Sequence, residues 1–279
     1  MAGEDLMRVA IGFLFLSSLG IAALAQAPTG PLYVPVQVRT LTIVSNDVPQ
    51  ELRQHIVLAY QGRTYPLGGL EERIRQGLRD MGYANASVEI PQLASMPVPS
   101  PGQPVDVTVQ ISAGAIYRLS EIRFEHASFR PEQLRTGFPI ADGSVFNATA
   151  IGKGLDNLKN FYQSIGFTNF GAIPKLQCDE AHHLIVLTID IDEGEQYLFG
   201  HLLLDGVEPH PGAAQVLETA WKPLEGEVYN PRVFAQWLGA NATFIPNAQT
   251  ASEKYVSVLI DDDNHRVNVQ LEFPSRAID

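Results

Sequence analysis

The chain has 279 residues, of which 45% are hydrophobic, and carries a formal net charge of −12 at pH 7. Acidic charge without a basic cluster excludes a nucleic-acid binder that neutralises phosphates, and it gives no attraction to anionic membrane surfaces. A single cysteine excludes an intrachain disulfide framework. The length is too great for one small domain and suits several units that each bury a modest core.

The N-terminal segment is apolar or small from residue 9 to residue 25. Its length is typical of a secretory signal peptide or of a short membrane span, and Ala23-Leu-Ala25 is a small-x-small cleavage signal. We predict a signal peptide at 1–25 and a Pro/Gly linker at 26–34. An uncleaved N-terminal anchor is the alternative, and both interpretations put the remainder outside the cytoplasm.

The first folded stretch begins with an alternating strand at 36–44. Apolar residues at helical spacing then predict helices over 49–60 and 67–81. Short strands are expected at 87–90 and 105–111. Five prolines and a glycine fall between residues 91 and 104, so an irregular excursion separates these two strands.

The middle stretch repeats this order of elements. A strand is expected near 122–125, a short helix at 129–134, and a longer helix over 151–162. Gly166 follows the last periodic residue, where a left-handed C-terminal cap is needed. Strands at 170–177 and 184–192 complete the stretch.

The last stretch predicts a strand at 201–206, helices at 213–221 and 231–238, and a hairpin of strands 253–260 and 266–273. Trp221 and Trp237 fall on apolar helix faces, so we expect them in the core.

Three landmarks recur in the same order at a period of roughly 80 residues, which indicates tandem copies of one small domain. A Gly-x-x-aromatic turn stands at 62–65, 143–146 and 226–229. A Gly-aromatic pair stands at 82–83 and 166–167, and a Gly-x-x-Tyr motif at 114–117 and 194–197. The last stretch lacks the Gly-aromatic pair.

These motifs resemble the polypeptide-transport-associated domain, called POTRA, on the turn at 143–147, the helix over 155–167 and the close at 189–197. The resemblance implies an α+β fold of tandem POTRA-like domains. Each would run strand, helix, helix, strand, strand, with two helices on one face of a three-stranded mixed sheet. We expect domains at 35–116, 117–197 and 198–275.

The resemblance also implies a non-enzymatic periplasmic scaffold in outer-membrane protein insertion or secretion. Its partners would be an outer-membrane barrel protein, through which it is membrane-associated, or unfolded exported polypeptides. No series of alternating ten-residue strands follows residue 274, so we expect any barrel to be a separate protein. A stand-alone adaptor and a chain truncated from a barrel partner both fit this pattern.

The sequence predicts no catalytic residue, cofactor or metal site. Cys178, His182 and His183 lie where a turn is expected, and Asp261–Asp263 lack the glycine and distal glutamate of a calcium loop. Solvated turns are the favoured interpretation of both. A periplasmic hydrolase or metal-binding protein with an unrecognised site is the alternative function.

Function is therefore expected in the backbone, because an edge strand can accept an extended peptide through main-chain hydrogen bonds. In the POTRA family the strand after the second helix tends to lie at an edge, which here means 170–177 and 253–260. Pro174 agrees with an edge position, since proline cannot donate to a central ladder. The strand at 253–260 is the longest unbroken candidate. The expected peptide-binding residues are Lys254, Tyr255, Val256, Ser257 and Val258, with Ala172, Ile173 and Lys175.

Overall fold

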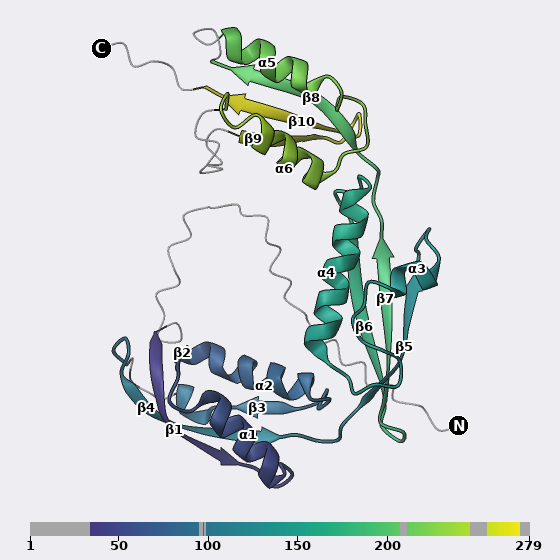
Figure 1. Ribbon diagram of the computed structural model, residues 1–279. Helices are drawn as coiled ribbons and strands as arrows, with labels where there is room; N and C mark the ends of the chain where they lie inside the picture. The colour runs from purple at the N-terminus through teal and green to yellow at the C-terminus, as the bar shows by residue number, and fades with distance from the viewer. Residues whose placement is uncertain (1–33, 95–96, 98, 207–210, 246–255, 274–279) are drawn as a thin grey trace. The chain divides into compact units, whose positions relative to one another are not determined.

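The computed structural model describes residues 34–94, 97, 99–206, 211–245 and 256–273 (Figure 1). Within these ranges no helix has the length and apolarity needed to cross a membrane. The predicted signal peptide and all but the last residue of the predicted linker lie outside the described residues.

The first sheet is built from four strands and packs with two α-helices. Its elements in chain order are β1 (Pro35–Val44), α1 (Gln50–Tyr60), β2 (Thr64–Pro66), η2 (Leu67–Gly69), α2 (Leu70–Asp80), β3 (Ser87–Glu89), η3 (Pro91–Ala94) and β4 (Pro104–Ser112). The strand order is β2-β1-β4-β3, with β1 parallel to β4 and β3 antiparallel to it. The expected strands and helices are confirmed. The short strand β2 was not predicted, and it forms where the Gly-x-x-aromatic turn pairs with the start of β1.

One face of the first sheet is buried. Along β4, buried positions alternate with exposed or half-exposed ones, which is the pattern of a sheet covered on a single side. The buried side joins the apolar faces of the helices in one cluster that includes Val36, Leu52, Ile74 and Val109.

The middle sheet has the strand order β5-β7-β6. Its elements are β5 (Arg118–Glu125), α3 (Pro131–Arg135), α4 (Ala148–Ser164), β6 (Gly171–Asp179) and β7 (Leu184–Asp192). The sequence placed all five elements, but β5 starts four residues earlier than expected. Alternate residues of β7, from Ile185 to Ile191, are buried, as are Ile151, Leu155 and Leu158 of α4.

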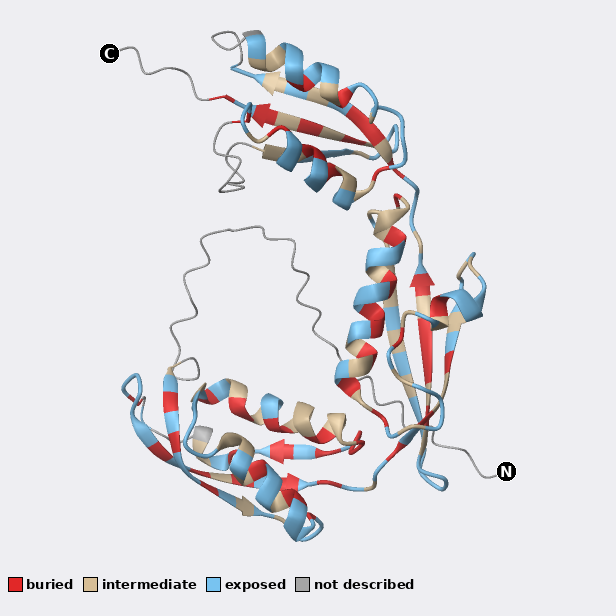
Figure 2. Cartoon of the chain, viewed as in Figure 1, coloured by how far each residue is buried: buried red, intermediate tan, exposed pale blue. Residues whose placement is uncertain are grey.

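The third sheet has the order β8-β10-β9, with β10 parallel to β8 and antiparallel to β9. Its elements are β8 (Leu198–Asp205), α5 (Pro211–Trp221), α6 (Pro231–Ala240), β9 (Val256–Asp261) and β10 (Arg266–Glu272). Buried and intermediate positions alternate along β10, and its first exposed residue is Glu272 (Figure 2). Both tryptophans are buried in this core, as expected.

The chain forms two compact units, and the residues of the middle sheet are shared between them. Among the described residues, the first unit contains those of 34–123, 138–154 and 174–189, and the second contains those of 124–137, 155–173 and 190–273. The two recurring motif clusters described below each lie within one unit.

Candidate functional site

Each sheet ends in the strand that follows its second helix. The strand orders put β3, β6 and β9 at an edge. In the first sheet β3 pairs only with β4, and in the third sheet β9 pairs only with β10. The other side of β3 and of β9 therefore has no partner strand among the described residues. Unpaired N–H and C=O groups at such an edge are a template for strand addition.

At the opposite edge of each sheet, the Gly-x-x-aromatic turn pairs with the first long strand. The Gly-x-x-aromatic turn forms strand β2 against β1 in the first sheet. In the other two sheets the same turn makes a single bridge, from Arg118 to Val145 and from Leu198 to Val228. This turn therefore occupies part of the edge formed by β1, β5 or β8, which leaves β3, β6 and β9 as the more open edges.

Strand β6 holds three of the predicted peptide-binding residues. Ile173 is 64% exposed, while Ala172 is half-buried. Lys175 is exposed in the same outward register as Ile173. Pro174 lies between them and has no backbone N–H to donate.

Strand β9 holds Val256, Ser257 and Val258, whereas Lys254 and Tyr255 lie outside the described residues. The residues opposite Val258 and Ile260 are Val269 and Val267, which are both buried. Cross-strand partners point to the same side, so Val258 and Ile260 extend the core face of the sheet. They are nevertheless 45% and 50% exposed. Strand β9 thus combines an open ladder with an uncovered apolar rim.

The Gly-x-x-Tyr and Gly-aromatic landmarks meet in space. We call the first meeting point joint 1, formed by Gly82, Asn85 and Tyr117 inside the first compact unit. The backbone N–H of Tyr117 donates to the carbonyl of Gly82 at 2.8 Å, and the Asn85 amide donates to the Tyr117 hydroxyl at 3.3 Å. The tyrosine is thereby fixed at both its backbone and its side chain.

Joint 2 repeats this geometry with Gly166, Asn169 and Tyr197 inside the second compact unit. The Tyr197 N–H donates to the Gly166 carbonyl at 2.8 Å, and the Asn169 amide donates to the Tyr197 hydroxyl at 3.1 Å. Sequence reasoning missed both asparagines. The signal that could have found them is their shared place three residues after the glycine.

A second asparagine bond completes each joint. The Nδ2 of Asn147 donates to the carbonyl of Asp80 at the end of α2, and the Nδ2 of Asn230 donates to the carbonyl of Ser164 at the end of α4, both at 2.9 Å. Each asparagine also accepts a backbone N–H in the first turn of the following helix. The asparagine therefore caps one helix and contacts the end of another.

An open hollow of about 560 Å³ adjoins joint 1 and is lined by Asp80, Ser144, Asn147, Thr149 and Lys153, among others. Its asparagine and Thr149 already bond Asp80. Much of its polar lining is thus engaged in holding the joint together.

The candidate metal ligands that the sequence singled out are not brought together. Cys178 is exposed at the end of β6, and His182 pairs with Asp179 at 2.7 Å. Asp261–Asp263 lie at the β9–β10 hairpin, as predicted, where Asp261 accepts from Asn264 and Asp262 accepts from the Tyr197 hydroxyl. Within the described residues, the one group of three or more His, Cys, Asp or Glu side chains close enough to hold a metal ion is Glu125, His126 and Asp190.

Comparison with known proteins supports the fold. Residues 117–194 match the POTRA family model, described as a surface antigen variable number repeat. The structure is similar to that of the BamA segment POTRA3-5 from Haemophilus influenzae, with a TM-score of 0.55 and 17% identity, covering 88% of this chain and 99% of that one. The similarity to POTRA1-3 of the periplasmic domain of Omp85 from Anabaena is weaker, with a TM-score of 0.34 and 17% identity, covering 88% of this chain and 97% of that one.

The family model thus matches the middle sheet, and the similarity to the BamA segment extends over most of the chain. Residues 117–194 are a POTRA domain, and the chain has the α+β fold of tandem POTRA domains.

Proposed function

We propose that this protein is a non-enzymatic periplasmic scaffold that binds exported polypeptides or assembly partners by strand addition, in outer-membrane protein insertion or secretion. The observation that carries the proposal is the open edge of β9, with its exposed apolar rim. Its partners are unfolded exported polypeptides or an outer-membrane barrel protein. The predicted signal peptide and the POTRA match support a periplasmic location.

The domain boundaries proposed from sequence are 35–116, 117–197 and 198–275. Each range encloses one sheet with its own helices. The Gly-x-x-Tyr motifs fall at the two internal boundaries and supply the tyrosines of joints 1 and 2. Each of the three domains has one such edge strand, at β3, β6 and β9.

Edge binding needs no particular guest sequence, because main-chain groups make the hydrogen bonds and side chains only modulate them. Strand β9 adds a preference for aliphatic side chains on the rim side, where Val258 and Ile260 are uncovered. A long apolar edge is an aggregation hazard unless a partner covers it. Covering this edge is therefore a role for a partner strand.

The test compares Val258→Lys with Leu58→Lys in the full-length protein, using a fluorescent peptide of alternating valine and threonine as the guest. Both substitutions replace an exposed aliphatic residue with a cation, but Leu58 lies on helix α1. We expect Val258→Lys to weaken peptide binding about tenfold and Leu58→Lys to leave it unchanged. Equal affinity in both variants would contradict a site on β9.

A pair of proline variants tests the backbone contribution. Neighbouring residues of an antiparallel edge strand point their N–H groups to opposite sides. Of Ser257→Pro and Val258→Pro, one therefore disrupts the domain's own ladder and lowers its unfolding temperature. The other should keep more of that stability and lose guest binding. Normal guest binding in the more stable variant would contradict a site on β9 and favour the edge of β6, where Ile173 is exposed.

A further inference from the structure

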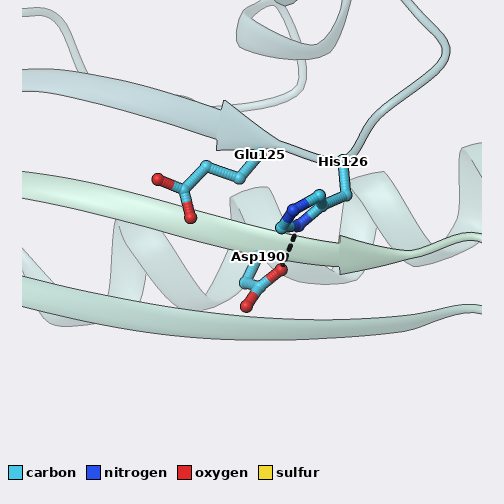
Figure 3. A group of neighbouring side chains, drawn as sticks. All are labelled: Glu125, His126 and Asp190. Carbon is cyan, nitrogen blue, oxygen red and sulfur yellow. Dashed lines mark hydrogen bonds and ion pairs between the residues drawn. The ribbon is translucent and has the colours of Figure 1, made fainter.

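Three side chains that can bind a metal ion converge on the middle sheet, apart from the residues proposed for peptide binding. Glu125 is the last residue of β5, His126 follows it, and Asp190 lies in the neighbouring strand β7. One ligand atom from each lies within 4.8 Å of the other two. Figure 3 shows the His126 ring turned toward Asp190, with the Glu125 carboxylate alongside.

The ring of His126 pairs with the carboxylate of Asp190. Its Nδ1 lies 2.7 Å from Oδ1 of Asp190, and the side chain is 74% exposed. His183 and His265 share its positive φ, but their rings pack against Tyr117 and Tyr197, with centroids 5.7 and 5.8 Å apart. His126 therefore presents Nδ1 to Asp190 and much of its ring to solvent, which suits ligation.

The donor set selects the class of ion. One imidazole nitrogen with two carboxylate oxygens suits Zn²⁺ and similar divalent transition metals, whereas Mg²⁺ and Ca²⁺ prefer oxygen alone. Two carboxylates balance a divalent charge. A chain with a net charge of −12 does not repel the ion.

We propose that Glu125, His126 and Asp190 bind one divalent transition-metal ion. Ligand atoms around a tetrahedral zinc stand about 3.3 Å apart, so atoms that lie within 4.8 Å of one another need to close by at most roughly 1.5 Å. Glu125 and His126 are exposed, and rotation of their side chains supplies this movement. Water fills the fourth position, as in open three-ligand sites.

The experiment is calorimetric titration of the full-length protein, carrying no polyhistidine tag, with ZnCl₂ and separately with MgCl₂. We expect one zinc per chain and much weaker binding of magnesium. His126→Gly should weaken zinc binding at least tenfold. Glycine accepts the positive φ of this position, so the variant removes the imidazole without adding backbone strain.

The matched control is His201→Gly. His201 also pairs with a carboxylate, Glu225, at 2.6 Å, but no third ligand joins that pair in the part of the chain that the structure describes. Zinc should raise the unfolding temperature of this control and of the parent protein, and not that of His126→Gly. Full zinc affinity in His126→Gly would overturn the proposal. So would loss of binding in His182→Ala, because the ligands would then be in the turn at 178–183.

Discussion

Joints 1 and 2 are built on the same backbone hydrogen bonds, yet each adds polar contacts that the other lacks. At joint 1 the carboxylate of Asp80 accepts the backbone N–H and the hydroxyl of Thr149, both at 2.8 Å. At joint 2 the equivalent residue is Ser164, which offers only its carbonyl to Asn230. The shared bonds define the motif, and the added contacts are particular to each copy.

One added contact of joint 2 comes from the residue four positions before the glycine. In joint 1 that residue is Leu78, and in joint 2 it is Tyr162, and both are fully buried. The Tyr162 hydroxyl donates to Glu193 at 2.7 Å, and Glu193 also accepts the N–H and hydroxyl of Ser128. Burial raises the pKa of Tyr162, and the bond to Glu193 raises it further. Joint 2 thus has a buried polar anchor where joint 1 has an aliphatic residue.

Substitution of the joint glycines should have the largest effect. Both have positive φ, +92° at Gly82 and +91° at Gly166. A Cβ at Gly166 would lie 2.8 Å from the backbone oxygen of Tyr197, whereas the closest atoms at Gly82 are methyl groups of Val145 and Ile116. We expect Gly166→Ala to cost about 2–4 kcal/mol and Gly82→Ala less, because side chains yield more easily than backbone.

The control for that comparison is Gly143→Ala. Its φ is +77°, and an added Cβ would meet nothing within 4 Å. This substitution should cost only the strain of a non-glycine residue at positive φ, which is about 1–2 kcal/mol. Chemical unfolding measures all three variants. If Gly166→Ala costs no more than Gly143→Ala, close packing at joint 2 does not matter for stability.

These joints also show what the sequence could and could not reveal. Spacing alone located Gly82, Gly166 and both tyrosines, because turn chemistry is local and recurs. The hydrogen bonds from Asn85 and Asn169 to the tyrosine hydroxyls join residues that are 28 or more positions apart in the chain. No local pattern encodes such a contact.

Long-range pairing limited the other predictions in the same way. Strand β2 is three residues long and exists only because β1 lies beside it. The group of Glu125, His126 and Asp190 needs β5 and β7 to be neighbours across 64 residues. The edge positions of β6 and β9 were predicted from the family resemblance and are confirmed, whereas peptide binding at them stays a prediction.

Tyr162→Phe isolates the polar anchor of joint 2, because it removes only the hydroxyl. Losing a hydrogen bond to a carboxylate should cost about 1.5–3 kcal/mol at neutral pH. Burial raises the pKa of Glu193, but the hydrogen bonds from Ser128 and Tyr162 outweigh burial and lower it overall. Because the pKa of Glu193 is lowered in the folded state, its ionised carboxylate stabilises the fold at pH values above the ordinary pKa of a glutamate. This stabilisation is lost as the pH falls. The difference between variant and parent should therefore shrink at acidic pH, as followed by thermal unfolding.

Asp80→Ala tests the contact that belongs to joint 1. It removes both bonds to Thr149 at the start of α4, where a carboxylate also interacts favourably with the helix dipole. We expect a loss of about 1 kcal/mol, a typical value for an N-cap interaction. Ser164→Ala is the matched control, since joint 2 uses the Ser164 carbonyl and keeps it. Equal losses in the two variants would mean that the Asp80 carboxylate adds nothing to joint 1.

The smallest effect is expected at Asp47, which contacts the glycine that opens the Gly-x-x-Tyr motif of joint 1. Its carboxylate accepts the Gly114 N–H at 3.0 Å and the Ser112 hydroxyl at 3.1 Å. At joint 2 the corresponding Gly194 N–H donates instead to Asp192, two residues earlier in the chain. The first joint thus recruits a distant loop where the second uses its own strand end.

The pH dependence of unfolding measures this difference. The hydrogen bond from Gly114, followed by that from Ser45, lowers the pKa of Asp47 to about 2. Because the folded-state pKa lies below that of the unfolded chain, near 3.9, the contribution is complete above about pH 4 and is lost as the pH falls toward 2. The side chain is exposed, so solvent screening keeps the effect small. Asp47→Asn should flatten the acid limb between about pH 4 and 2 and leave neutral stability within about 1 kcal/mol of the parent. An acid limb unchanged in this variant would show that the loop at 45–48 does not stabilise joint 1.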